Sequence, residues 1–156
     1  MSCKDRLESY LERASVSYEF HHHARAYTAQ EVAEREHVTG NRVAKVVMIL
    51  ANQRLAMLVT RASDHVDLNK AARALQADDA RLAVERDFAP VFPDCEVGAM
   101  PAFGNLYGLP VIVDRALSAN DEIFSQAGTH ADTVKLRFSD FQRVVHPLIA
   151  DVTRHA

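Results

Sequence analysis

Residues 43–50 form an apolar run that is interrupted by one charged side chain, that of Lys45. The β-branched and aliphatic residues of this run favour an extended backbone, and so apolar a segment suits an interior strand covered on both faces. Side chains alternate along a strand, which gives two predicted faces: Val43, Lys45, Val47 and Ile49 on one, and Ala44, Val46, Met48 and Leu50 on the other. Lys45 is therefore expected to point away from open water.

An ammonium group is costly to bury unless something compensates its charge. Lys45 can extend to a rim, pair with a carboxylate, lose its proton, or line a pocket that receives an anionic or carbonyl ligand. The pattern alone leaves all four readings open.

The segments on either side of this strand carry start and turn signals. Ser2 and Asp5 predict the start of an amphipathic helix over 3–14, and alternation predicts a strand over 16–22. Thr28 and Glu31 have the spacing of a capping box, which predicts a helix from 29 to about 37. Asn52-Gln53 is typical of a tight turn, so the Lys45 strand is expected to form a hairpin with a strand over 55–60.

The second half of the chain alternates strands with short helices. Asp67 is expected to cap a helix over 68–75, and Asp87 a helical turn that Phe92 ends before Pro93. Strands are predicted over 82–84, 109–114, 122–125 and 133–138. The last helix is expected to be capped at Ser139 and to kink or restart near His146, because Pro147 lacks a backbone donor. Together these elements predict a mixed α/β fold.

Composition sets limits on size and partners. With 156 residues, 48% of them hydrophobic, the chain can build one good core, so we expect a single domain over 1–156. A net charge of −3 excludes a broad electrostatic nucleic-acid binder, and any nucleic acid must be bound locally. No membrane-length apolar run or secretion signal is present, which predicts a cytoplasmic protein. Cys3 and Cys95 are then expected to be reduced thiols, Cys95 a buried structural one rather than a nucleophile.

Two stretches invite a chemical reading. The run His21-His22-His23 suggests a metal, but neighbours on a strand point to opposite sides and no ligand stands at a suitable spacing, so we expect a polar strand end and no metal. The loop 95–104 is expected to use Gly98 and Gly104, around Pro101, to adopt positive φ and expose backbone N–H groups to an anion or oxyanion. A plain turn is the alternative for this loop.

These segments together resemble the YbaK-type aminoacyl-tRNA deacylases, which include the editing domain of bacterial prolyl-tRNA synthetases and its free-standing relatives. The resemblance runs from about His21 to Pro147. It rests on six segments, none of which would suffice alone: the helix start 28–33, the Lys45 strand, the segment 66–70, the GxxPxxG loop 98–104, and the segments 109–114 and 127–130. It implies one domain with a curved, mixed central sheet flanked by helices, no cofactor, and a substrate ester between a mischarged amino acid and the terminal adenosine of a tRNA.

The resemblance also implies roles for individual residues. Lys45, Gly98 and His130 would be catalytic, with His130 at an exposed turn positioning substrate or activating water. The substrate-binding set would be His23, Tyr27, Thr28, Ala99, Met100, Pro101, Phe103, Gly104, Gly128 and Thr129. A departure from the family is that no basic segment marks where an acceptor stem would lie; the best local candidates for tRNA binding are Arg42, Arg61, Lys70 and Arg73.

The expected function is metal-independent hydrolysis of a mischarged aminoacyl-tRNA, tRNA-Pro with Ala, Cys or Ser being the first choice, with prolyl-tRNA synthetase as a partner. Val46 departs from the asparagine often found there in the alanine-specific branch, so the amino acid stays open. The alternative function is a catalytically idle module of the same fold that binds tRNA or a synthetase.

Overall fold

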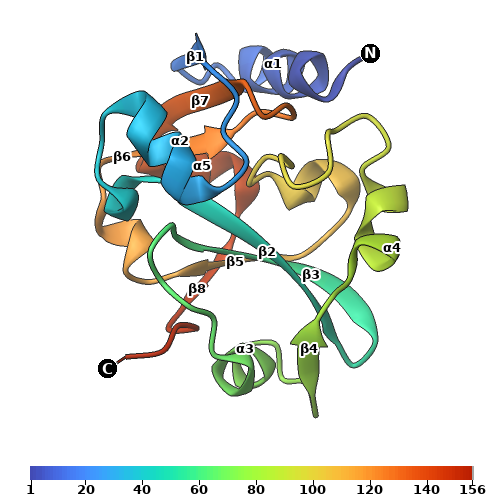
Figure 1. Cartoon of the computed structure of the whole chain (residues 1–156). Coiled ribbons are helices and arrows are strands. Elements are labelled where there is room, and N and C mark those ends of the chain that lie inside the picture. The colour runs from blue at the N-terminus through green and yellow to red at the C-terminus, as the bar shows by residue number, and fades with distance from the viewer. Residues whose placement is uncertain (156) are drawn as a thin grey trace.

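The computed structural model describes residues 1–155, whose strands form two sheets (Figure 1). The larger is a five-stranded mixed sheet in the order β4-β2-β3-β5-β8, made of β2 (Ala44–Ala51), β3 (Arg54–Arg61), β4 (Ala80–Leu82), β5 (Val111–Asp114) and β8 (Leu148–Ala150). The smaller is antiparallel, in the order β1-β7-β6, made of β1 (Tyr18–His22), β6 (Glu122–Gln126) and β7 (Asp132–Arg137). A parallel bridge between Val43 and Phe124 joins the two sheets. The predicted mixed α/β fold with a mixed central sheet is confirmed.

The predicted hairpin is formed by β2 and β3, in a register that places Lys45 opposite Thr60. Asn52 and Gln53 connect the strands with φ of 49° and 66°. Positive φ at both central residues gives a turn whose twist matches that of the strands, and asparagine tolerates it well. A local signal therefore fixes the register of the strand that carries Lys45.

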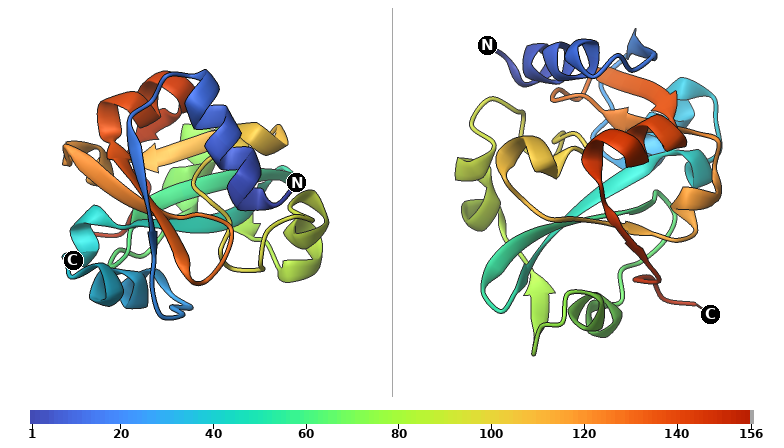
Figure 2. Two further views of the ribbon diagram at one scale, coloured as in Figure 1. Left: turned by 90° about the horizontal axis from the view of Figure 1, so that it is seen from above. Right: turned by 180° about the vertical axis from the view of Figure 1, so that it is seen from behind.

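Three helices begin close to their predicted caps. In α1 (Cys3–Arg13) Ser2 and Asp5 complete a capping box. In α2 (Ala29–Glu36) the Thr28 hydroxyl accepts the Glu31 N–H, and in α3 (Leu68–Ala74) Asp67 does the same for the first turn. Figure 2 shows α1 across one end of the molecule, while α3 and β4 lie at the other. No helix within residues 1–155 combines the length and apolarity that a bilayer crossing requires.

Several predicted boundaries are wrong, and packing explains them. β4 lies at 80–82 rather than 82–84 because it pairs with the end of β2. Asp87 lies in the first turn of α4 (Glu85–Phe88), where its carboxylate accepts the Val84 N–H, so it is not the residue before the helix. The helix α5 (Phe138–Val145) starts one residue before Ser139, with Arg137 at the N-cap position and Phe138 buried in the core. It then ends at His146, and Pro147 leads into β8 instead of a second helical segment. Short 3-10 turns occupy Gly40–Arg42, Ala89–Val91, Gly104–Tyr107 and Leu117–Ala119.

The alternation predicted for β2 separates two core clusters. Ala44 and Met48 pack in the main core, which also contains apolar residues of α1, α5 and the smaller sheet. Val47 and Ile49 face the opposite side, where Ala71 of α3 covers the five-stranded sheet. Lys45 shares this second face, since it has the same parity in the strand. The sheet thus directs the one charged side chain of the run toward the α3 side.

Candidate functional site

Lys45 lines a pocket of about 270 Å³ on the α3 side of the sheet. Its ammonium donates a hydrogen bond to the backbone carbonyl of Asp64. The Asp64 carboxylate is occupied by Arg61, with N–O distances of 2.7 and 3.1 Å. Burial lowers the pKa of Lys45, and attraction to Asp64 opposes that shift in part. Within residues 1–155 no carboxylate oxygen lies within 4.0 Å of the Lys45 ammonium, so its charge is solvated only in part and unpaired.

The glycine loop has one residue with the predicted backbone and one without it. Gly98 is exposed and has φ of +85°, a backbone conformation that residues with a side chain rarely adopt. Gly104 does not have positive φ in the described chain; it is buried, and a Cβ there would lie 3.1 Å from Val111 Cγ2 and 3.2 Å from Met57 Sδ. Gly104 is therefore small because the core is close, and the prediction of a positive φ there is wrong.

The backbone of this loop is fixed while some of its donors stay free. The Glu96 N–H donates to Gly128 O at 2.8 Å, and the Gly128 N–H donates to Ala99 O at 2.9 Å. In the described part of the chain, the N–H groups of Gly98 and Met100 have no hydrogen-bond acceptor. Rigid, unpaired N–H groups are suited to bind an anion or an oxyanion.

His130 is 9% exposed, so the prediction of an exposed turn histidine is wrong. Its backbone N–H donates to the Glu96 carboxylate at 2.7 Å, and its Nε2 lies 2.9 Å from the carbonyl oxygen of Val97. A carbonyl only accepts, so Nε2 carries the hydrogen and Nδ1 presents a lone pair in the neutral ring. Nδ1 is buried and has no partner among residues 1–155. Such an unsatisfied nitrogen is a candidate proton acceptor.

Tyr27 and Gly98 border the His130 ring. The Tyr27 ring, on a residue that is 58% exposed, has its centroid 4.9 Å from that of His130. A Cβ on Gly98 would lie 3.5 Å from His130 Cε1. The pKa of Glu96 is lowered mainly because its carboxylate accepts the hydrogen bond from the His130 N–H. The positive charge of Arg25, whose guanidinium lies 3.1 Å from the carboxylate, lowers it further. These contacts hold His130, Gly98 and Tyr27 together as one local group.

Lys45 lies near the start of β2, where the strand β6 that leads to the His130 loop bridges to the chain. Val43 pairs with Phe124 in parallel, so continuing that register places Lys45 level with Gln126, just before the loop that carries His130. No hydrogen bond or ion pair between described residues joins Lys45 to Gly98 or His130.

Cys3 and Cys95 form a disulfide, contrary to the expected pair of reduced thiols. Cys95 lies at the start of the glycine loop, and Cys3 is in the first turn of α1. A Cβ on Gly128 would lie 2.7 Å from Cys3 Sγ, so the bond packs directly under the segment that leads to His130. The sequence could not predict this pairing, because the two cysteines are separated by 92 positions and only the tertiary fold brings them together.

The histidine run is held by carboxylates that the sequence places far away. His21 Nδ1 lies 2.6 Å from Glu36, and His22 Nδ1 lies 3.0 Å from Asp132. His23 turns its Nε2 to the Thr133 hydroxyl at 2.7 Å. Within residues 1–155, the one cluster of three potential metal ligands is Cys3, Asp94 and Cys95, and its two sulfurs are bonded to each other. His21 and His23 both face Glu36, the latter at 3.9 Å, whereas His22 faces Asp132 on the other side of the strand, so the three rings do not converge on one point.

The other predicted substrate residues are dispersed. Thr28 is exposed and uses its hydroxyl to cap α2, and Thr129 donates its hydroxyl to Asp132 at 2.6 Å. Ala99, Met100 and Pro101 are buried beneath the loop surface. Phe103 is 0% exposed and packs edge-on against Phe141, so its side chain belongs to the core. The structure therefore brings Tyr27 to His130 and leaves Phe103 away from any surface.

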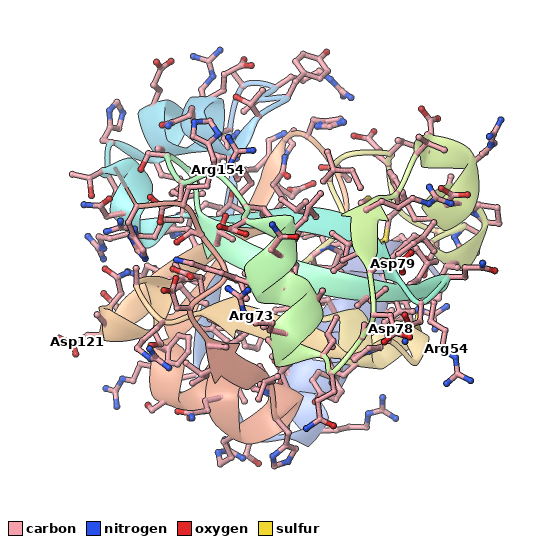
Figure 3. All side chains as sticks on the ribbon, turned by 90° about the horizontal axis from the view of Figure 1, so that it is seen from below. Arg54, Arg73, Asp78, Asp79, Asp121 and Arg154 are labelled. Carbon is pink, nitrogen blue, oxygen red and sulfur yellow. A yellow bond between two sulfur atoms is a disulfide. The ribbon has the colours of Figure 1, made fainter. Side chains whose placement is uncertain are left out.

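Most of the predicted tRNA-binding cations have carboxylate partners. Arg42 lies 3.4 Å from Glu122, Arg61 is paired with Asp64, and Lys70 lies 2.9 Å from Asp151. Arg73 is exposed (Figure 3), and no carboxylate of residues 1–155 lies within ion-pair distance of it. Sequence reasoning missed His65 and Arg154, which line the Lys45 pocket. Neither residue carries a local signal for that position.

A family model described as the aminoacyl-tRNA editing domain matches residues 23–144 of the chain. Among solved structures, the hypothetical protein APE2540 is similar with a TM-score of 0.87 at 16% identity, covering 96% of this chain and 99% of that one. A proposed trans-editing enzyme for prolyl-tRNA synthetase is similar with a TM-score of 0.83 at 18% identity, covering 99% of each chain. A proposed signal transduction protein from Marinobacter aquaeolei VT8 has a TM-score of 0.75 at 17% identity, covering 97% of this chain and 31% of that one. At these identities the likeness to solved structures establishes the fold.

Proposed function

Because the chain belongs to the aminoacyl-tRNA editing domain family, we propose that it hydrolyses the ester bond of mischarged aminoacyl-tRNA. We infer tRNA-Pro carrying Ala, Cys or Ser as its substrate, and prolyl-tRNA synthetase as a partner. The protein would act as one domain over residues 1–156, in the cytoplasm where charged tRNA is used. Protein groups and the tRNA itself would supply the chemistry, without a metal.

The unpaired charge of Lys45 is the observation that carries this proposal. A half-buried ammonium without a carboxylate gains most from an anion that enters its pocket. The phosphate next to the terminal adenosine of a tRNA supplies such an anion. The aminoacyl ester is on the ribose of that adenosine, one nucleoside away from the phosphate. Lys45 would therefore hold the substrate through charge and orient the ester relative to the glycine loop.

His130 and the free N–H groups of the loop would act on the ester itself. A water molecule attacks the carbonyl carbon and gives a proton to His130 Nδ1, the buried nitrogen that has no protein partner. The N–H groups of Gly98 and Met100 stabilise the negative charge that develops on the carbonyl oxygen. The intermediate then collapses, the ribose oxygen leaves as a hydroxyl by taking that proton, and the free amino acid is released.

The catalytically idle tRNA-binding or synthetase-binding module is the second candidate. Such a module would use the charge of Lys45 for binding. It would not explain why Nδ1 of the buried His130 has no hydrogen-bond partner, an arrangement that is unfavourable for stability. Hydrolysis is favoured for this reason.

The test is deacylation of a panel of purified mischarged tRNAs by wild type and variants. We expect Lys45→Ala to lower the rate by about 10²–10³-fold, which is typical of losing one oriented electrostatic donor. Lys45→Arg should not rescue the rate, because a planar guanidinium needs more room than an ammonium. Lys135→Ala is the matched control, since this strand lysine is paired with Glu19 at 2.9 Å in the smaller sheet.

Circular dichroism must show that each variant is folded. A folded Lys45→Ala variant with the wild-type rate would remove Lys45 from the mechanism. A wild-type protein that binds tRNA but cleaves no member of the panel would favour the binding module.

A further inference from the structure

We propose that Arg154 and His65 extend the Lys45 pocket into a phosphate-binding site for the single-stranded 3′ end of a tRNA. The identity of the ligand rests on the proposed function. The site itself rests on the pocket, whose lining residues are Lys45, Val47, His65, Val66, Leu68, Leu82 and Arg154.

Arg154 is fixed beside the pocket by backbone contacts. The segment that follows β8 runs antiparallel to residues 65–67, with a bridge between Val66 and Thr153. The Arg154 N–H donates to His65 O at 2.9 Å, and the Asp67 N–H donates to Val152 O at 2.8 Å. The guanidinium therefore extends from a fixed backbone position, and little conformational freedom of the main chain is lost when an anion binds.

The pocket has positive charge that the described residues do not neutralise. No carboxylate of residues 1–155 lies within 4.0 Å of Lys45 or Arg154. The carboxylates beside the lining residues in the chain are occupied: Asp64 by Arg61, Asp151 by Lys70 and His155, and Asp67 by the N–H groups of Asn69 and Lys70. Figure 3 shows Arg154 beside the loop that leads into α3. A phosphodiester is the ligand that such an unpaired arginine and lysine complement best.

Apolar walls give the pocket a second character. Val47 and Leu68 form part of its lining, and Leu82 is 55% exposed although it is a large hydrophobic residue. At about 270 Å³ the pocket lies just below the roughly 300–1,000 Å³ of drug-sized sites. These features suit one nucleotide, with its base or ribose against the leucines and its phosphate toward the cations.

The test measures binding of uncharged tRNA, so it does not depend on hydrolysis. We expect Arg154→Ala to weaken binding about tenfold and to lower the slope of log K against log salt by about 0.7, the contribution of one single-strand phosphate. Arg154→Lys should keep most of the slope. Arg54→Ala is the matched control, because Arg54 is exposed at the hairpin end and lies on the other side of the molecule in Figure 3.

A second probe places the contact on the tRNA. With a tRNA that lacks its single-stranded 3′ end, the Arg154→Ala variant should bind as the wild type does, since the two deletions remove the same contact. A loss of equal size on the truncated tRNA, or no loss on the intact one, would overturn the proposal. So would AMP binding that depends on Arg154 when tRNA binding does not.

The outcomes separate this inference from the proposed function. Arg154-dependent tRNA binding by a protein that deacylates nothing supports the site and refutes the function. Normal deacylation with tRNA binding that is indifferent to Arg154 refutes the site and leaves the function standing.

Discussion

The disulfide between Cys3 and Cys95 should contribute a large part of the stability of the fold. It closes a loop with a sequence separation of 92, for which the chain-entropy relation gives about 4.6 kcal/mol. The two residues are the only cysteines of the chain, so a reductant acts on this bond alone. Reduction, or the double change Cys3→Ser and Cys95→Ser, is expected to lower Tm by about 10–15 °C in a domain of this size.

The assay is thermal unfolding followed by circular dichroism, because the chain has no tryptophan to report on it. The double-serine variant should unfold at the same temperature with and without reductant, and close to the reduced wild type. Titration must show two free thiols after reduction. An unchanged Tm in fully reduced wild type would refute the stabilising role of the disulfide. It would mean that the packing contacts of α1 are sufficient to hold this helix in place. In the cytoplasmic setting that we propose, thiol reductants would favour the reduced form.

Substitution of the two loop glycines should have different effects, measured by urea unfolding and by the deacylation rate. Gly98→Ala should lower the free energy of unfolding by about 1–2 kcal/mol because of its positive φ, and should slow deacylation in a protein that is still folded. Gly104→Val should lower the free energy of unfolding by about 1–3 kcal/mol or more, because the added side chain overpacks the core. Glu36 raises the pKa of His21, so this pair contributes stability below pH 6.5 that is lost as pH rises through the raised pKa; Glu36→Gln should remove that part of the pH dependence in a stability series. EDTA should leave the deacylation rate unchanged, because no proposed step uses a metal, and a loss that added zinc restores would contradict the mechanism.

The sequence was informative wherever neighbours along the chain decide the structure. The caps at Ser2, Thr28 and Asp67 accept N–H groups two or three residues away, as predicted. The capping box is complete at Ser2, whereas at Thr28 the described residues show no return bond from the Thr28 N–H to Glu31. The Asn52-Gln53 turn belongs to the same class. Alternation placed Lys45 on the face opposite Met48 because strand geometry is periodic.

Contacts between distant segments could not be predicted in this way. The pairing of Cys3 with Cys95 and the burial of His130 depend on how the α1 end meets the glycine loop. The role of Gly104 as a small residue against Met57 likewise comes from packing across the sheet. Arg154 had no signal at all, since its place beside Lys45 results from a backbone pairing with residues 65–67.

The late position of β8 in the chain has a consequence for how the protein is made. β8 is the last strand of the described fold, yet it pairs in parallel with β5 and the segment after it closes the wall of the Lys45 pocket. During synthesis the earlier strands leave the ribosome first, and they would wait with one edge of β5 unpaired. The pocket would be complete only once Arg154 has left the ribosome. A nascent chain would therefore stay unable to hold a tRNA end beside the ribosome, where such ends are abundant.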